Sequence, residues 1–327
     1  MRSVRFHEYG SPEVLIVDEV PDPEPGEGQL LVRVSAAGIS YAETQIRSGL
    51  MQRFAWFPDP PLPYAPGFEV AGTVVRVGAG VGDEWVGRKV VGAAPTAGGY
   101  SELAVLPAGA AQPIPDGLGE HEALALFGQG VVAVGVAEVA AIQPKDVVLV
   151  QAAAGGVGSL LVQLAKNAGA EVIALARGEK KLALARELGA DHVLDYTEEG
   201  WEQRVRDVAP AGVQVAFDGV GGEVSKASFD LLAMGFGRLV VYGTAGGTAP
   251  QFDPEMLYVR GVSVSGFGPR VFLQPEYGAR LRQTAFELAA AGTLKPVVGQ
   301  VFPLAEAAAA HRAFEERTTL GKAVLVP

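Results

Sequence analysis

The segment that most constrains this chain is a glycine-rich turn at residues 152–158, which directly follows the apolar run at 147–150. Apolar residues at helical spacing continue from the turn to Ala168, and a second apolar run occupies residues 172–175. This pattern predicts a strand, a tight turn, a helix and a second parallel strand. Backbone N–H groups and the positive end of the helix then meet at one point, an arrangement that suits a pyrophosphate.

The turn is close to the dinucleotide-binding pattern GxGxxG, with Ala153 at the first glycine position and Gly155 and Gly158 at the others. An ordinary tight turn is the alternative. Two more glycine clusters follow predicted strands, after Asp218 and after Tyr242. Their members are Gly219, Gly221, Gly222, Gly243, Gly246 and Gly247. Because parallel strands end at one edge of a sheet, we expect the three turns to line one cofactor groove. The alternative is that turn geometry alone selects these glycines.

The residues after the second predicted strand indicate which cofactor binds. An NAD site usually carries Asp or Glu about 20 residues past the glycine pattern, whereas a 2′-phosphate needs cations. Arg177 and Lys181 stand in this region, so we predict NADPH over NADH. The alternative is that both are solvated charges paired with Glu179.

Composition excludes several other classes of protein. With 327 residues, 49% of them hydrophobic, the chain is long enough for two domains with a large core. A net charge of −11 without a basic cluster argues against a nucleic-acid or membrane partner. The absence of cysteine and the scatter of four histidines argue against a metal site. No leader and no apolar run near about 18 residues occur, so a cytoplasmic location is expected.

Two different sequence patterns divide the chain into domains. Residues 1–122 contain short β-rich runs bounded by Gly and Pro, typical of a compact barrel-like domain. Residues 123–266 alternate apolar strands with helices, which predicts an α/β, doubly wound parallel sheet. The tail, 267–327, loses this alternation and is expected to complete the first domain. The strictly alternating run at 262–266 is typical of a strand that is half exposed or paired with another chain.

No nucleophilic triad can be assembled from the sequence, because no Ser lies in a strand–turn–helix elbow and no His has a visible partner. Hydride transfer from a nicotinamide needs none.

Six motifs occur in order along nearly the whole chain: AGIS at 37–40, IRSG at 46–49, PGFEVAG at 66–72, AAAGGVG at 152–158, FDGVGG at 217–222 and GKAV at 321–324. This series resembles the medium-chain dehydrogenase/reductase superfamily, and within it the zinc-free, zeta-crystallin-like quinone oxidoreductases. The resemblance implies a GroES-like catalytic domain interrupted by a Rossmann domain, with NADPH in the cleft between them. It also implies a homodimer formed through the last Rossmann strand.

The resemblance also assigns cofactor contacts. Lys181 and Tyr196 match a Lys and a Tyr that contact the 2′-phosphate in zinc-free relatives, although Tyr196 is alternatively a surface aromatic. The complete predicted cofactor-binding set is Ala153, Gly155, Gly156, Val157, Gly158, Arg177, Lys181, Tyr196, Asp218, Val220, Gly243, Thr244, Phe267 and Lys322.

Departures from the family pattern concern the substrate side. Zinc-dependent relatives have Cys near Ser40 and His at the place of Phe68, so no zinc chemistry is expected. Enoyl thioester reductases carry a proton-donating Tyr at the place of Met51. We therefore take Tyr41, Ser40 and Tyr64 as the candidate catalytic residues, with solvent as the alternative proton source.

The expected activity is NADPH-dependent hydride transfer to a quinone or an α,β-unsaturated carbonyl, a small, apolar and electron-poor substrate. Two alternatives remain open: enoyl thioester reduction in a biosynthetic pathway, and a catalytically weak NADPH-binding sensor or structural protein. A proline-rich stretch carries Phe54, Trp56 and Phe57, which either form a lid over the substrate or anchor a loop on the core.

Overall fold

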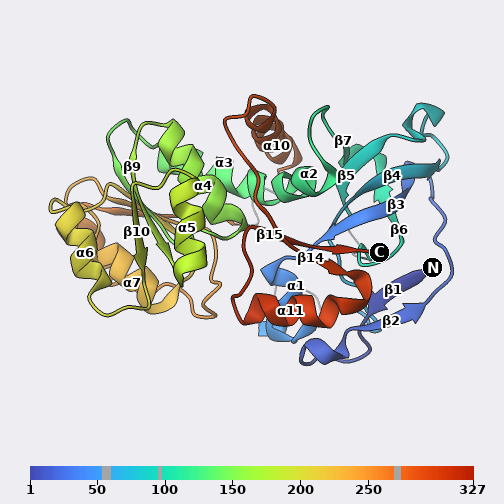
Figure 1. Ribbon diagram of the computed structural model, residues 1–327, viewed down its shortest axis with the longest axis horizontal. Helices are drawn as coiled ribbons and strands as arrows, with labels where there is room; N and C mark the ends of the chain where they lie inside the picture. Colours follow the sequence, from blue (N-terminus) through green and yellow to red (C-terminus); the bar gives the residue numbers. More distant parts are fainter. Residues whose placement is uncertain (54–59, 95–97, 269–273) are drawn as a thin grey trace. The chain divides into compact units, whose positions relative to one another are not determined.

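The computed structural model describes residues 1–53, 60–94, 98–268 and 274–327. The chain divides into two compact units (Figure 1). Unit 1 comprises Met1–Gly128 and Val297–Pro327, and unit 2 comprises Gln129–Pro296. The second unit is therefore an insertion in the first. The expected boundaries after residues 122 and 266 differ from the observed ones after 128 and 296.

Unit 2 is built on a six-stranded sheet in which every pair of neighbouring strands is parallel. Its strands are β8 (Val147–Val150), β9 (Glu171–Ala176), β10 (His192–Asp195), β11 (Val215–Asp218), β12 (Arg238–Val241) and β13 (Ser263–Gly266). They are arranged in the order β10-β9-β8-β11-β12-β13. This is the doubly wound dinucleotide-binding order, and the direction of winding reverses between β8 and β11.

Helices cover both faces of this sheet. The helices of unit 2 are α3 (Gln129–Ala140), α4 (Gly156–Asn167), α5 (Glu179–Glu187), α6 (Trp201–Val208), α7 (Gly222–Asp230), α8 (Glu255–Arg260) and α10 (Pro275–Ala290). Figure 1 shows α4 and α5 on one face and α6 and α7 on the other, as right-handed crossovers require on either side of a reversal. Burial of the apolar strand residues between these two layers produces the core.

Helix α10 explains why the second boundary lies beyond residue 266. Leu281 on α10 is fully buried, and a Cβ placed on Gly135 of α3 would stand 3.0 Å from its Cδ1. The bare face of α3 thus receives both α10 and the ring of Phe267. No further strand of the sheet follows α10, so the alternation of strand and helix stops before the domain does.

Unit 1 is mainly antiparallel β structure. Its strands are β1 (Arg2–Arg5), β2 (Ile16–Glu19), β3 (Gln29–Gly38), β4 (Glu69–Val77), β5 (Lys89–Ala93), β6 (Leu103–Pro107), β7 (Ala111–Pro113), β14 (Val298–Pro303) and β15 (Lys322–Val326). Seven of them form a sheet in which β15, from the chain's end, pairs with β3. Its helices are α1 (Tyr41–Arg47), α2 (Glu120–Phe127) and α11 (Ala307–Glu315). The C-terminal segment therefore completes the first unit.

Within the described ranges, no single helix is long and apolar enough to cross a membrane. Helices α2 and α3 reach the length and apolar composition of a membrane span only as a bent pair.

Candidate functional site

The glycine turn after β8 is held in place by its own backbone. Ala152 adopts a left-handed conformation with φ of 48°. The N–H of Ala153 donates to the carbonyl of Leu175 on β9 at 3.1 Å, and that of Gly155 donates to the carbonyl of Ala152 at 2.8 Å. The turn is thereby fixed to the ends of two neighbouring strands, and α4 begins directly after it.

Gly158 is required by close packing within this turn. A Cβ at this position would lie 2.2 Å from the carbonyl oxygen of Ala152 and 3.0 Å from the Cα of Ala153. No side chain fits, so only glycine lets the helix approach the strand end this closely. Gly155 is less restricted, because a Cβ on it would lie 3.2 Å from the carbonyl oxygen of Ala152.

The start of α4 presents unused hydrogen-bond donors. Gly156, Val157 and Gly158 occupy its first three positions, where a helix has no internal acceptor for its N–H groups. Within the described part of the chain, no other acceptor meets these three N–H groups. Three converging donors at the positive end of a helix match the charge and the oxygens of a phosphate.

In the second glycine turn, a side chain of the protein already accepts the backbone N–H groups. Asp218 is completely buried at the end of β11, and its Oδ1 accepts the N–H groups of Gly221 at 2.9 Å and Val220 at 3.1 Å. Burial raises the pKa of this carboxyl above its ordinary value, although these hydrogen bonds oppose the shift. The two backbone donors just before α7 are therefore already occupied, unlike those of α4.

The second and third glycine turns pack against each other. A Cβ on Gly219 would lie 2.6 Å from the ring of Tyr242, and one on Gly221 would lie 2.1 Å from the carbonyl of Thr248. The N–H of Gly246 also donates to the carbonyl of Val220 at 2.7 Å. Contact between the two turns accounts for Gly219, Gly221 and Gly246. Gly243 and Thr244 follow β12 and remain partly exposed.

The cations predicted to select the cofactor lie beside the first turn. Asp195 of β10 is in register with Ala176 of β9, so Tyr196 and Arg177 follow the ends of neighbouring strands. Lys181 lies in the first turn of α5. Arg177 is exposed, whereas Tyr196 is half-buried against the core. The structure thus brings these three predicted residues to one edge of the sheet.

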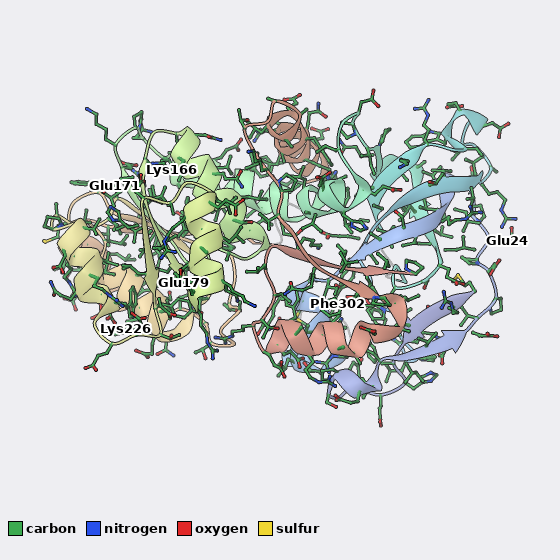
Figure 2. The ribbon with its side chains drawn as sticks, viewed as in Figure 1. Glu24, Lys166, Glu171, Glu179, Lys226 and Phe302 are labelled. Carbon is green, nitrogen blue, oxygen red and sulfur yellow. The ribbon has the colours of Figure 1, made fainter. Side chains whose placement is uncertain are left out.

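Two carboxylates shape the neighbourhood of Arg177. Glu179, labelled in Figure 2, forms an ion pair with Arg186 at 2.7 Å. Asp195 accepts the N–H of Gly178 at 2.7 Å and is bonded by both the N–H and the hydroxyl of Thr197. These bonds, with the charge of Arg177, lower the pKa of Asp195 despite its partial burial. Asp195 therefore stays ionised and holds the turn that carries Arg177.

Two further residues of the predicted cofactor set have side chains that are engaged in the interior of a unit. The ring of Phe267 packs against Gly135, and its N–H donates to the carbonyl of Val241 at 2.8 Å. Lys322, in unit 1, is 2% exposed and forms an ion pair with Glu69 at 2.7 Å.

The candidate catalytic residues belong to unit 1. Ser40 caps α1, and Tyr41 is the first residue of that helix. Tyr64 pairs through its backbone with Phe6, and its ring packs on the Phe6 ring at a centroid distance of 5.4 Å. Burial, reinforced by the charge of Glu43, raises the pKa of Tyr64 well above its ordinary value. Its hydroxyl consequently remains protonated.

Sequence reasoning missed Glu43, although a Glu three residues after the Ser40 helix cap is a capping-box signal. Its carboxylate is 2% exposed and accepts the N–H groups of Ser40, Gly67 and Phe68 at 2.8, 2.8 and 3.1 Å. The buried hydroxyl of Tyr100 donates to it at 3.2 Å. Glu43 therefore ties the segment of Ser40 to the segment of Phe68.

Comparisons with known proteins extend these observations. A family model described as alcohol dehydrogenase GroES-like domain matches residues 26–116, and one described as zinc-binding dehydrogenase matches residues 156–277. Quinone oxidoreductase of Salmonella typhimurium is 35% identical over 333 residues, covering 99% of both chains. The chain belongs to the quinone oxidoreductase family of the medium-chain dehydrogenase/reductase superfamily.

Two further relatives are informative. The 2-haloacrylate reductase of a Burkholderia species is 33% identical over 330 residues, with 98% of both chains covered. The crystal structure of Escherichia coli quinone oxidoreductase complexed with NADPH has a TM-score of 0.90 and 32% identity, with full coverage of both chains. The superfamily and the fold predicted from the motifs are thereby confirmed.

The resemblance implies that zinc-dependent relatives have Cys near Ser40 and His at the place of Phe68. In this chain Ser40 offers a hydroxyl and Phe68 an apolar ring. Among the described residues, no group of three or more His, Cys, Asp or Glu side chains is placed to hold a metal ion.

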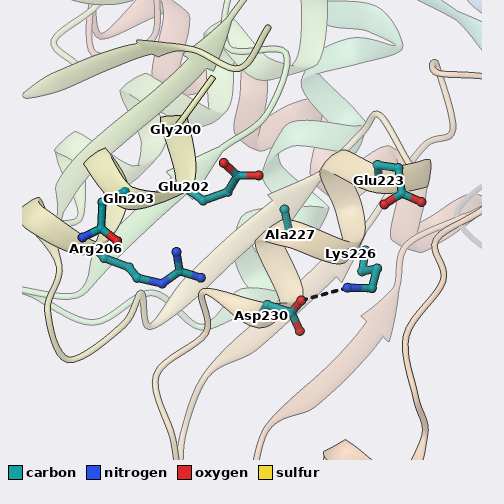
Figure 3. A pocket seen from close by; sticks show the side chains of 8 residues that line it. All are labelled: Gly200, Glu202, Gln203, Arg206, Glu223, Lys226, Ala227 and Asp230. Atoms are coloured by element: carbon teal, nitrogen blue, oxygen red, sulfur yellow. Dashed lines mark hydrogen bonds and ion pairs between the residues drawn. The ribbon is translucent and has the colours of Figure 1, made fainter. Parts of the chain in front are cut away.

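The structure also shows a polar hollow between α6 and α7, of ≈ 380 Å³ (Figure 3). It is lined by Gly200, Glu202, Gln203, Arg206, Glu223, Lys226, Ala227 and Asp230. None of these is a predicted site residue. Phe54, Trp56 and Phe57, expected either to form a lid or to anchor a loop, lie outside the described residues, whereas Met51 packs against the core of unit 1.

Proposed function

We propose that this protein is an NADPH-dependent reductase that transfers hydride to a quinone or an α,β-unsaturated carbonyl without zinc. The observation that carries the proposal is the cluster of unused N–H donors at Gly156–Gly158 beside Arg177, Lys181 and Tyr196. The donors suit a pyrophosphate and the cations suit a 2′-phosphate. The same observation supports NADPH over NADH.

Each part of the chain has a distinct task in this reaction. When bound, NADPH supplies the hydride. The start of α4 holds the pyrophosphate, while Arg177 and Lys181 hold the 2′-phosphate and orient the adenosine end. Tyr41 and Tyr64 are the candidate proton donors for the reduced acceptor, with Ser40 as a polar contact. The raised pKa keeps the Tyr64 hydroxyl protonated, and it also makes this hydroxyl a weaker acid than an ordinary tyrosine.

Zinc independence is supported by the donor set. A catalytic zinc site needs three protein ligands of the Cys, His or carboxylate type. Ser40 and Phe68 provide neither a thiolate nor an imidazole, and the chain contains no cysteine at all. Proton donation by a hydroxyl or by solvent then replaces Lewis-acid assistance in the proposed reaction.

The names of the relatives support an electron-poor acceptor. One is a quinone oxidoreductase and another is a 2-haloacrylate reductase. We therefore propose a panel of quinones, enones, 2-haloacrylate and enoyl-CoA thioesters, assayed with NADPH and in parallel with NADH. NADPH oxidation with a quinone or an enone, unchanged after treatment with a chelator, supports the proposal. Turnover of thioesters alone favours the biosynthetic alternative, and NADPH binding without turnover of any acceptor favours a sensor.

We also propose that the protein forms a homodimer through β13. This strand is the last of its sheet, and three of its four residues are exposed. Val259 and Tyr258 on the preceding helix α8 are 51% and 75% exposed. An uncovered strand edge with apolar neighbours fits a second copy of the same strand.

The strand's hydrogen-bonding pattern provides a test of this interface. Ser263 and Phe267 donate their N–H groups to the β12 segment, so Gly266 directs its N–H to the free side. Gly266→Pro removes that donor, whereas Gly266→Ala keeps it and meets nothing within 4 Å. Light scattering should show a weaker dimer for the proline variant alone. A monomeric wild type would contradict the proposal.

A further inference from the structure

Gln151 is a buried polar residue that the glycine motif does not include. It follows β8 directly, precedes the turn, and is 0% exposed. It lies where β8 and β11 are neighbours and the sheet reverses its winding. A fully buried amide at this point needs partners at both of its ends.

Both ends of the side chain are bonded, and all three partners belong to the β11–α7 unit, whose strand neighbours β8 in the sheet. Nε2 donates to the hydroxyl of Ser228 at 2.8 Å and to the carbonyl of Val224 at 3.4 Å, both on α7. Oε1 accepts the N–H of Val220 at 3.2 Å. Gln151 therefore connects the end of β8 to the turn before α7 and to α7 itself through the domain interior.

The backbone of Gln151 makes two more connections. Its N–H donates to the carbonyl of Phe217 on β11 at 3.1 Å. Its carbonyl accepts the hydroxyl of Tyr242, which follows β12, at 3.5 Å. All three glycine turns thus meet at this one residue. The next residue is Ala152, whose carbonyl oxygen limits the approach of Gly158.

The partners require an amide at this position. The hydroxyl of Ser228 donates its hydrogen to the carbonyl of Val224 at 2.8 Å, so toward Gln151 it acts only as an acceptor. Oε1 also shares the N–H of Val220 with the carboxylate of Asp218. A glutamate in place of Gln151 has the same size, but when ionised it lacks the donor and places a second negative charge beside Asp218.

We propose that Gln151 is a positioning residue for the cofactor: it holds the donor turn at the start of α4 in register with the β11 and β12 ends without touching the cofactor. This inference rests on the proposed NADPH function. It predicts that Gln151 sets the affinity for NADPH through the geometry of the turn at 152–158.

Gln163 provides a matched control. It is 7% exposed, lies on α4 in the same unit, and has both ends of its amide bonded. Nε2 donates to the carbonyls of Ser159 and Lys295 at 3.0 and 2.9 Å, and Oε1 accepts the N–H of Lys295 at 2.8 Å. Gln163→Glu therefore places the same charge in a similar setting away from the strand ends.

The test compares Gln151→Glu, Gln151→Met and Gln163→Glu by NADPH titration and by amide hydrogen exchange without cofactor. We expect both Gln151 variants to raise the Kd for NADPH about tenfold or more and to speed exchange at 152–158. Gln163→Glu should lower the melting temperature with little change in either quantity. The affinity of Gln151→Glu, relative to wild type, should recover from about pH 8 to pH 5 as the new carboxyl gains a proton and becomes a donor.

Wild-type affinity in both Gln151 variants, or equal loss of affinity in Gln163→Glu, would overturn the positioning role. If the wild type itself does not bind NADPH, the proposed function fails, and the exchange rates at 152–158 still decide whether Gln151 holds the turn. Unchanged exchange in the Gln151 variants would then contradict the inference on its own.

Discussion

Gly158 lies against the carbonyl of Ala152 so closely that a Cβ on it would stand 2.2 Å from that oxygen. The helix that presents three free N–H groups therefore depends on the absence of one methyl group. Gly158→Ala must push α4 away from β8 or distort the turn, at a cost of about 1–3 kcal/mol.

We expect Gly158→Ala to raise the Kd for NADPH about tenfold or more, because the donors move away from the pyrophosphate. Fluorescence titration measures this change. Gly109→Ala is the control, since a Cβ there meets nothing within 4 Å. Equal affinity of the Gly158 variant and the wild type would argue against a phosphate at this turn.

Arg177→Asp should shift the preference of the enzyme from NADPH toward NADH. A cation that binds the 2′-phosphate is replaced by a carboxylate that repels it, and losing one charge-assisted bond costs about 1.5–3 kcal/mol. The ratio of kcat/KM for NADPH to that for NADH should therefore fall about tenfold to a hundredfold. Arg186→Asp, on the helix α5 that follows Arg177 and paired there with Glu179, should leave the ratio nearly unchanged. An unaltered ratio in Arg177→Asp would remove this residue from the site.

Removing the hydroxyls of Tyr41 and Tyr64 one at a time distinguishes the two candidate proton donors. Loss of a general acid lowers kcat by about 10² to 10⁴-fold. Tyr41→Phe and Tyr64→Phe should therefore differ sharply in stopped-flow reduction of an enone if one of them is the donor. Because the pKa of Tyr64 is raised, its participation predicts a kcat that stays flat toward alkaline pH. Full turnover in both variants assigns the proton to solvent.

Buried His311 predicts acid sensitivity of unit 1. Burial, with the charge of Arg47, lowers the pKa of His311 from 6.5 to about 3. The unfolded chain therefore binds a proton that the folded chain does not, in the window between these two values. The free energy of unfolding should fall as pH drops below 6.5, by up to about 1.4 kcal/mol per pH unit from this residue.

His311→Gln does not titrate, and its amide is able to hydrogen-bond the Tyr100 hydroxyl that contacts His311 at 3.1 Å. Denaturant unfolding of both proteins at several pH values isolates the histidine's contribution. The wild type should lose more stability than the variant between about pH 6.5 and pH 4. Parallel curves would show that His311 does not titrate as its burial predicts.

Much of the nucleotide unit was predictable because its signals are local. The apolar runs and the glycine turn at 152–158 mark β8, α4 and β9 within about 30 residues, which is the length of one βαβ unit. The confirmed fold agrees with that order of elements, and the confirmed superfamily was identified from the resemblance of the six motifs along the chain. The positions of Arg177 and Lys181 were likewise predictable, because the end of a parallel strand defines where the residues that follow it lie.

The rest depends on partners distant in sequence. The roles of Gly219 and Gly221 are set by Tyr242 and Thr248, and that of Gln151 by Ser228 on α7. The boundary after residue 296 depends on the packing of α10 on α3, which no strand–helix alternation signals. Glu43 carried a local signal, the capping box, but its bonds to Gly67 and Phe68 come from tertiary structure.

Isothermal titration of the wild-type protein with NADPH and, separately, with NADH tests the central claim most directly. The account predicts saturable binding of both, tighter for NADPH because Arg177 and Lys181 meet the extra phosphate. Absence of NADPH binding by correctly folded protein, or tighter binding of NADH, would contradict it.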